Sequence, residues 1–525
     1  MRLRPVVFLF VIGLAAAERP VALSPGLGSW THPIGTRNPQ AQKFFDQGQS
    51  LLYGFNRHEA LRSFRKALEL DPTSAMAQWG ISMALGPYLN MDMDPEVHVK
   101  EACEAAKAGA ALTLSSSPQQ MWLEAAAARC PDFSDPTKYV DAMKALAARF
   151  PDDPDAQTWY AESLMLPVRW RWYDADGKPA PGVTEAQRVL EGVLRRFPYH
   201  PGANHLYIHA VESSPNPERA VPSAQRLMGI VPAAGHMVHM PGHIWLVLGD
   251  FQTTVDVNER AAQVDREYFA KSGVVPDYYA YYLHNLQFIL YARTMQGRIA
   301  DTKRAIANIR DAAKPMAQMM PEMVGIIDLT SAMSLLRINQ WDDVLAFPKP
   351  ADSNPLAAAM SHYLHALAFA AKGNLSQATE ERKAFEDLRP KLDRKMQWGD
   401  NEFGNVLDLA EAQIAARMET SPAAAAEHWR RAADIQDHLA YDEPPAWYYP
   451  VRESWGAALL ASGDAAGAET VFREGLRRSP KNGRMLFGLL ESLKAQQKTD
   501  DAVWVQREFD AAWKGADIAL NLKGL

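Results

Sequence analysis

The stretch AQKFFDQGQSLLYGFNRHEALRSFRKALELDPTS, residues 41–74, predicts two short antiparallel helices, because apolar residues recur at helical spacing through both of its halves. Small side chains let two helices approach each other closely, a large side chain fills the contact, and a proline ends the second helix. The residues that fit these roles are Gly48, Ala60, Phe64, Ala67 and Pro72. The stretch therefore predicts a helix-turn-helix unit of 34 residues.

The same pattern returns near the other end of the chain, at residues 449–482, YYPVRESWGAALLASGDAAGAETVFREGLRRSPK. The matching residues there are Gly456, Gly463, Ala468, Phe472 and Pro480, and glycines at 249, 297 and 373 mark further turns between helices. Both stretches resemble the tetratricopeptide repeat (TPR) family. That resemblance implies an all-α fold of TPR helix-turn-helix repeats forming a right-handed α-solenoid, or superhelix, of roughly ten to twelve helix pairs.

The first residues, MRLRPVVFLFVIGLAAAERP, combine two arginines, an apolar run and a small-residue cleavage site, which is typical of a secretory signal peptide. We expect a signal peptide at 1–17, an N-terminal extension at 18–40 and a TPR-like solenoid at 41–525. The stretches NHLYIHAVE, HMPGHI and YDEPPAWYYP resemble a group of exported bacterial TPR proteins of no settled activity. The expected location is therefore the periplasm or the extracellular space.

Composition excludes several classes of function. The net charge of -7 argues against a nucleic-acid surface, and no apolar run after the leader is long enough to span a membrane. We find no motif of a serine hydrolase, a nucleotide-binding loop or an EF-hand. The two cysteines, Cys103 and Cys130, form either one disulfide or two buried thiols.

Histidines are concentrated in one region, since seven of the chain's 14 fall between residues 200 and 284. We expect a histidine-rich groove segment at 201–291. His205 and His209 occupy positions 5 and 9 of one repeat, and His239 and His243 occupy the same positions of the next. These positions share one side of the first helix of each repeat, opposite its packing positions. Resemblance to TPR proteins implies that this side lines a concave groove.

Two histidines four residues apart on a helix can reach one metal ion, and neighbouring helices are close enough to add further imidazoles. His236 and His284 fall at position 2 of their repeats and Glu212 at position 12, so they join the same side. The predicted metal-binding residues are His205, His209, Glu212, His236, His239, His243 and His284. Imidazole with a carboxylate suits copper, zinc or iron, and six histidines suffice for two ions.

Other readings of these residues stay open, namely a buried polar network, an anion-binding groove or a coincidence of placement. Pro241 and Gly242 lie within HMPGHI, so the helix there is expected to be kinked or to start late. The insertion at 168–184 and the segment YDEPPAWYYPVR are rich in aromatic residues, which either plug the fold or stack a ligand. His32 has no partner at ligand spacing and receives no role.

Two hypotheses about function follow. The first is an exported TPR solenoid whose histidine-lined groove binds a transition metal, with metal-dependent oxidation or hydrolysis as the activity if a coordination position is open. The second is a non-enzymatic TPR scaffold that binds a peptide, a partner protein or a small-molecule ligand in its groove, with the imidazoles as pH-sensitive contacts. Neither predicts a nucleic-acid partner.

Overall fold

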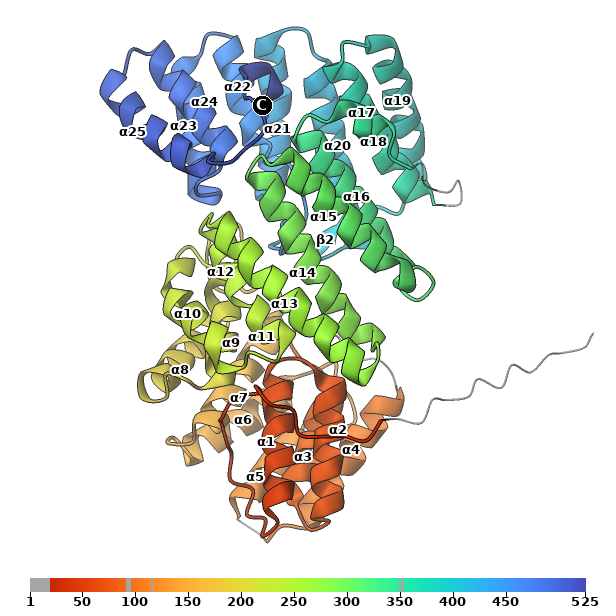
Figure 1. Cartoon of the computed structure of the whole chain (residues 1–525), viewed down its shortest axis with the longest axis vertical. Coiled ribbons are helices and arrows are strands. Elements are labelled where there is room, and N and C mark those ends of the chain that lie inside the picture. Colours follow the sequence, from red (N-terminus) through yellow and green to blue (C-terminus); the bar gives the residue numbers. More distant parts are fainter. Residues whose placement is uncertain (1–18, 91–95, 115–116, 349, 351–353) are drawn as a thin grey trace, which may run out of the picture.

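The computed structural model describes residues 19–90, 96–114, 117–348, 350 and 354–525. The expected signal peptide at 1–17 lies outside the described residues. Helices follow one another along the long axis of the molecule, from the N-terminal repeats at one end to the C-terminal repeats at the other (Figure 1). The prediction of an all-α solenoid of helix pairs is confirmed.

The first part of the chain forms helices that pack against their neighbours in sequence. They are α1 (Pro39–Tyr53), α2 (Arg57–Leu70), α3 (Ala75–Leu85), α4 (Glu96–Ala111), α5 (Pro118–Ala127), α6 (Thr137–Arg149), α7 (Pro154–Met165) and α8 (Val183–Arg196). The middle part contains α9 (Pro201–Glu212), α10 (Val221–Ile230), α11 (Gly235–His239), α12 (Pro241–Val247), α13 (Phe251–Ser272) and α14 (Pro276–Met295).

The C-terminal part continues the same pairwise packing. Its helices are α15 (Ile299–Ala313), α16 (Pro321–Arg337), α17 (Trp341–Leu345), α18 (Pro355–Ala371), α19 (Leu375–Leu388), α20 (Phe403–Met418), α21 (Pro422–Asp437), α22 (Arg452–Ala461), α23 (Ala465–Arg478), α24 (Gly483–Ala495) and α25 (Thr499–Ala512). Two short strands, β1 (Gln397–Trp398) and β2 (Asn401–Glu402), pair antiparallel. Short 3-10 turns lie at η1 (Leu166–Val168), η2 (Pro217–Ala220), η3 (Lys314–Met316), η4 (Arg389–Lys391) and η5 (Leu522–Gly524).

The small and large residues of the predicted units meet as expected. A β-carbon added to Gly48 would lie 2.7 Å from the Phe64 ring, and one added to Gly456 would lie 2.4 Å from the Phe472 ring. Each ring therefore occupies space that any side chain at the glycine would take. The glycines predicted to mark turns, Gly249, Gly297, Gly373 and Gly463, all have positive φ.

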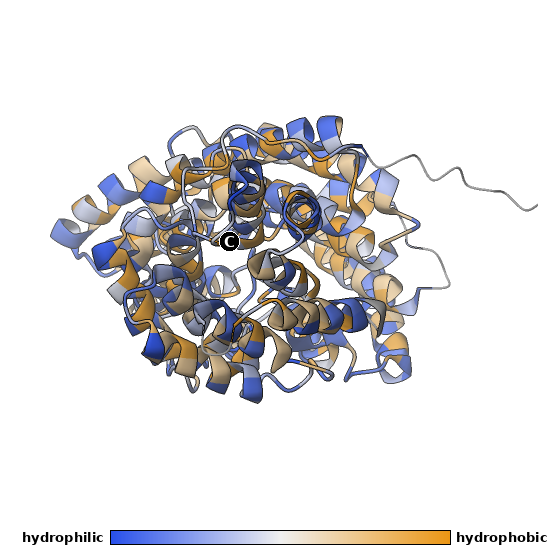
Figure 2. Ribbon diagram, turned by 90° about the horizontal axis from the view of Figure 1, so that it is seen from below, coloured by the Kyte–Doolittle hydropathy of each residue, from blue (hydrophilic) through white to orange (hydrophobic). Residues whose placement is uncertain are grey.

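The hydrophobic core is divided into three clusters of buried residues that follow one another along the chain, within residues 27–281, 246–451 and 457–525. Figure 2 shows hydrophobic residues on the helix faces that meet neighbouring helices and hydrophilic residues toward the outside. Such a core grows by neighbour-to-neighbour packing, as in repeat proteins generally. Among the described residues, no helix has the length and apolar character needed to cross a membrane.

Cys103 in α4 and Cys130 just after α5 are joined by a disulfide. Of the two alternatives for these cysteines, the structure therefore shows the bonded one. The bond links two consecutive helices of the N-terminal part, and neither cysteine belongs to the groups of side chains described below.

Candidate metal centre

Three histidines from two helices converge on one point. His205 and His209 leave α9 one turn apart, and His236 comes from α11. The Nε2 atom of His205 lies 3.1 Å from Nε2 of His209 and 3.2 Å from Nε2 of His236. We call these three residues the first triad.

A second convergence lies next to the first. His239 at the end of α11 and His243 in α12 have their Nε2 atoms 2.7 Å apart, and the ring of His284, from α14, is 4.9 Å from the His239 ring. In each triad the candidate ligand atoms lie within 4.8 Å of one another. His239, His243 and His284 form the second triad, and its rings approach those of the first to 5.6 Å between His209 and His243.

The other ring nitrogens face hydrogen-bond acceptors. His205 Nδ1 is 2.5 Å from the backbone carbonyl of Tyr53, and His239 Nδ1 is 2.6 Å from Oδ1 of Asn258. Asn258 is itself held by a bond from its Nδ2 to the carbonyl of Thr254. A carbonyl oxygen can only accept, so both histidines carry their proton on Nδ1.

Glu212 connects the two triads. Its Oε1 accepts from Nδ1 of His209 at 2.8 Å, and its Oε2 accepts from Nδ1 of His243. The carboxylate thus lies behind the rings and fixes both as Nδ1–H tautomers, which is the usual outer-shell partnership of histidine ligands. Burial alone would raise the pKa of Glu212, but His243 and His209 outweigh it and lower that pKa to about 2.

The site is enclosed rather than open. The five histidines other than His284 are at most 1% exposed, while His284 is partly exposed. Burial, and then the neighbouring imidazoles, lower the pKa of His205, His236 and His239 well below the usual value and that of His284 to about 3. These rings are therefore neutral at pH 7.

Neutral, Nδ1-protonated rings have a lone pair on Nε2. In the pair His205–His209, and again in His239–His243, the two Nε2 atoms face each other at 3.1 and 2.7 Å. When both rings of a pair are neutral, neither nitrogen has a hydrogen to donate, and the contact is then repulsive unless a cation or an added proton lies between them. Nδ1 of His236 has no hydrogen-bond partner among the described residues.

Aromatic rings cover both triads. Phe55, in the turn between α1 and α2, packs on all three rings of the first triad, and Trp170 and Trp172 from the insertion pack on His209. Phe288 packs on all three rings of the second triad. Phe55 and Trp170 have φ of 56° and 61°, a left-handed conformation that costs energy in a non-glycine residue and is concentrated at functional sites.

Pro241 and Gly242 of HMPGHI each have a structural role. α11 ends at His239 and α12 begins at Pro241, so the expected interruption of the helix is present. A β-carbon on Gly242 would lie 2.6 Å from Nδ2 of Asn258, the residue that accepts the His239 proton. Glycine at 242 therefore lets Asn258 reach the second triad.

The structure brings together every residue predicted to bind metal. Five of the six rings are enclosed in the molecule, because Phe55, Phe288 and the insertion cover them. Trp170 and Trp172 of the insertion pack inside the fold, against His209. Sequence reasoning missed Tyr53 and Asn258, which reach the site as a main-chain carbonyl and a single amide, and no motif marks either.

A second polar cluster lies beside the first triad. His32, Asp153 and Asp155 offer ligand atoms within 4.8 Å of one another, although no role was expected for His32. Asp155 already accepts hydrogen bonds from five side chains, so its oxygens are committed. The contacts of His32 with Asp155 span 123 residues of sequence, which is why spacing gave no signal for them.

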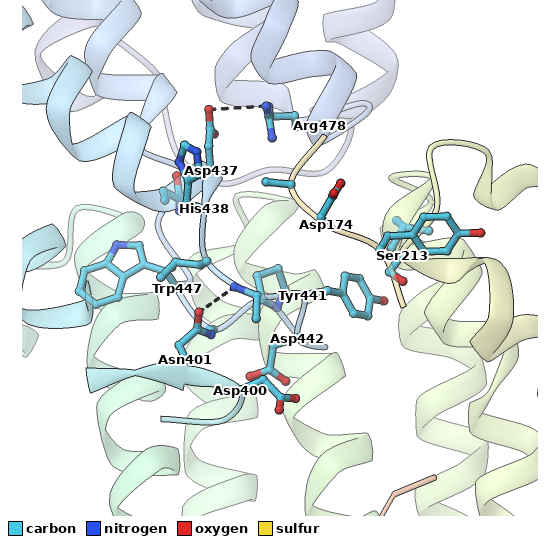
Figure 3. A pocket seen from close by; sticks show the side chains of 18 of the residues that line it. Asp174, Ser213, Asp400, Asn401, Asp437, His438, Tyr441, Asp442, Trp447 and Arg478 are labelled. Atoms are coloured by element: carbon cyan, nitrogen blue, oxygen red, sulfur yellow. Dashed lines mark hydrogen bonds and ion pairs between the residues drawn. The ribbon is translucent and has the colours of Figure 1, made fainter. Parts of the chain in front are cut away.

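The segment YDEPPAWYYPVR connects α21 to α22 and reaches the second triad. Glu443 Oε1 is 3.8 Å from Nδ1 of His243, and its Oε2 has no hydrogen-bond partner among the described residues. Tyr441 lies beside Glu212 and also lines a cavity of about 850 Å³. Figure 3 shows this cavity with Asp174 and Ser213 on one side and Asp437 and Trp447 on the other.

No protein-family profile and no curated protein sequence matches the chain. Among solved structures, it is similar to yeast Tom70, at 12% identity over 90% of each chain with a TM-score of 0.28. It is also similar to the human IFIT1 dimer with m7Gppp-AAAA, at 12% identity over 91% of each chain with a TM-score of 0.35. At this identity and these TM-scores, neither protein bears on the activity or the ligand of this chain.

Proposed function

We propose that the protein binds two transition-metal ions, one at each histidine triad. The observation that carries this proposal is the close approach of the Nε2 atoms in the pairs His205–His209 and His239–His243, with an acceptor at the Nδ1 atom of each ring. A cation in each triad converts a repulsive contact into coordination. The hydrogen bonds at the opposite ring nitrogens supply the outer shell that histidine ligands ordinarily have.

The spacing supports this assignment. Two nitrogens that bind one tetrahedral ion at about 2.1 Å are about 3.4 Å apart. The Nε2 atoms of the first triad are 3.1 and 3.2 Å apart, so they need move only slightly. The His239–His243 pair, at 2.7 Å, has to open further. Six imidazoles without a thiolate suit copper, zinc or iron, and copper(II) binds nitrogen sites most tightly among the common divalent ions.

Three protein ligands per ion leave a coordination position open, as in catalytic rather than structural metal sites. A metal-dependent oxidation or hydrolysis is therefore the proposed class of activity. His284 of the second triad is partly exposed, whereas the rings of the first triad are buried under Phe55 and Trp170, so a substrate would reach the second triad first. The substrate itself is left open by this proposal.

Export to the periplasm or the extracellular space forms part of the proposal. Its support is the leader-like composition of residues 1–17 and the disulfide between Cys103 and Cys130, since such bonds persist in oxidising compartments. A fusion of residues 1–40 to a periplasmic reporter tests it. Retention of that reporter in the cytoplasm would contradict export.

Elemental analysis of untagged protein tests the metal proposal. After equilibration with copper, zinc or iron and removal of the excess, the wild type should hold about two ions per chain. The variants His205→Ala/His209→Ala and His239→Ala/His243→Ala should each hold about one. The variant His362→Ala/His365→Ala, which changes two histidines of α18 outside the triads, is the matched control and should still hold two.

A scaffold function is the second candidate. The cavity of about 850 Å³ between residues of the middle and C-terminal parts is large enough for several side chains of a bound peptide, and helical repeats commonly present such surfaces. Under this function the wild type would bind a peptide or a partner protein without holding metal. The elemental analysis therefore separates the two candidates.

A further inference from the structure

Asp155, near the start of α7, is a buried carboxylate on which five side chains from three separate segments converge. Its Oδ1 accepts from Tyr53 Oη at 2.7 Å, Gln49 Nε2 at 2.8 Å and His200 Nε2 at 3.1 Å, and its Oδ2 accepts from His32 at 3.0 Å. The indole of Trp30 lies 3.1 and 3.3 Å from the two oxygens. Two of these partners, Tyr53 and His200, also contact α9, which carries His205 and His209 of the first triad.

We propose that Asp155 is a positioning residue for the first triad, acting through Tyr53 and His200, and that residues 19–38 serve as a clasp that holds it. This inference rests on the proposed metal function. It assigns a role to residues that bind no metal themselves. It predicts that metal affinity at the first triad depends more strongly on Asp155 than metal affinity at the second triad does.

The link through Tyr53 is short. Its hydroxyl donates to Asp155, and its own backbone carbonyl accepts the Nδ1 proton of His205. The ring lies against α9, because a β-carbon on Gly202 would be 2.3 Å from it. By binding the Tyr53 hydroxyl, Asp155 therefore fixes the end of α1. This also fixes the Tyr53 carbonyl, which sets the tautomer and the ring orientation of His205.

The link through His200 holds the helix itself. Nδ1 of His200 accepts from the backbone N–H of Ala203 and caps α9, so its proton is on Nε2, which donates to Asp155. α9 carries His205, His209 and Glu212. Asp155 thus fixes the start of α9 through His200. Through Tyr53 it also fixes the carbonyl that accepts the Nδ1 proton of His205.

The segment at 19–38 closes over this carboxylate. Besides the bonds from Trp30 and His32, the segment is tied to α1 by the bond from the backbone N–H of Ser24 to Gln47 at 2.8 Å. It is also tied to the chain just before α11, where the backbone N–H of Ala233 donates to the carbonyl of Gly26 at 3.0 Å. The segment therefore spans the elements that carry the ligands of the first triad. No contact of this kind reaches His243 or His284 among the described residues.

Cobalt(II) titration, followed by visible absorption, measures metal affinity in variants that retain only one triad and so tests the proposal for each triad separately. In the His239→Ala/His243→Ala background only the first triad remains, and Asp155→Asn should weaken cobalt binding there by about 10-fold. Tyr53→Phe, which removes only the hydroxyl, should produce a smaller loss of the same kind. In the His205→Ala/His209→Ala background the same substitutions should lower the affinity of the second triad less, because they reach it only through Glu212 of α9. Tyr160→Phe, which removes the hydroxyl of a tyrosine in α7 that bonds to Glu185, is the matched control and should change neither triad.

Equal losses at both triads, or no loss at the first with the fold intact, would overturn the positioning role. A second measurement needs no metal: in histidine-labelled, metal-free wild type, the Nδ1 proton of His205 should be protected from exchange, and Asp155→Asn should abolish that protection. Retained protection in the variant would also overturn the proposal. If wild-type protein takes up no metal, the proposed function fails, and this proton signal still decides the role of Asp155.

Discussion

His209 and His243, 34 residues apart and on different helices, are hydrogen-bonded to the two oxygens of one carboxylate, that of Glu212. Each belongs to a different triad, so one side chain fixes a ring in both candidate sites. This arrangement makes the two sites one centre. It also makes Glu212 the residue whose replacement should affect both ions together.

Glu212→Gln should therefore weaken metal binding at both triads. The amide of glutamine can accept from one imidazole N–H but presents its own N–H to the other, and losses of outer-shell partners cost about 10- to 100-fold in metal affinity. Competition with a chromophoric chelator measures the affinities. A variant that retains two ions with unchanged affinity would show that the carboxylate does not orient the ligands.

Gly242→Ala should disturb the second triad selectively. The added methyl group would lie 2.6 Å from Nδ2 of Asn258, which must then move away from His239. We expect weaker binding at the second triad and little change at the first, measured by titration of single-triad backgrounds. Gly229→Ala in α10 is the control, because nothing lies within 4 Å of its β-carbon, and alanine there should stabilise the helix by up to about 1 kcal/mol.

The stability of the metal-free protein should fall with acid in the range where the buried histidines resist protonation. Burial, with His243 next, lowers the pKa of His284 from 6.5 to about 3, so between these values the unfolded chain binds more protons than the folded one. The stability contributed by neutral His284 is thus present above pH 6.5 and is lost as the pH falls toward 3. Urea midpoints at several pH values measure this loss.

His284→Gln provides the comparison for that experiment. The variant lacks the titrating group, so its midpoint should fall less steeply between pH 6.5 and 5 than that of the wild type. Glu443 works in the opposite direction, because burial and then Glu212 raise its pKa well above the usual value, but it is unchanged in both proteins. Identical slopes would mean that His284 is protonated in the folded state.

Loss of the disulfide should cost stability without affecting the metal centre. The bond between Cys103 and Cys130 closes a loop with a sequence separation of 27, for which about 2–4 kcal/mol of unfolding free energy is expected. Cys103→Ser/Cys130→Ser should therefore unfold at lower urea concentration and still hold as much metal as the wild type. A parallel loss of metal would show that α4 and α5 support the centre.

Sequence periodicity was enough to place the main candidate ligands. His205, His209, His239 and His243 recur with the repeat itself, so the register of a helix-turn-helix unit put them on neighbouring helices. Periodicity said nothing about contacts that bridge distant segments. Asp155 accepts hydrogen bonds from residues 45 to 125 positions away in the sequence. Glu443 lies 3.8 Å from His243, although the two residues belong to different parts of the solenoid. Such contacts depend on the superhelical path of the chain, which a local pattern does not encode.

The sequence also did not show which residues enclose the site. The same helix side faces a groove when a solenoid is open and an interior when loops fold over it. Here Phe55 and Trp170 turn inward through left-handed backbone conformations that the residue types themselves disfavour. The covering rings were visible in the sequence as aromatic residues, but their direction was not.

Anomalous diffraction from crystals of the metal-loaded protein tests the central claim most directly. Two peaks per chain are expected, one about 2.1 Å from Nε2 of His205, His209 and His236 and the other at the same distance from Nε2 of His239 and His243 and a ring nitrogen of His284. A single peak, a peak coordinated through Glu212 without the rings, or an empty centre in protein exposed to excess metal would contradict the account.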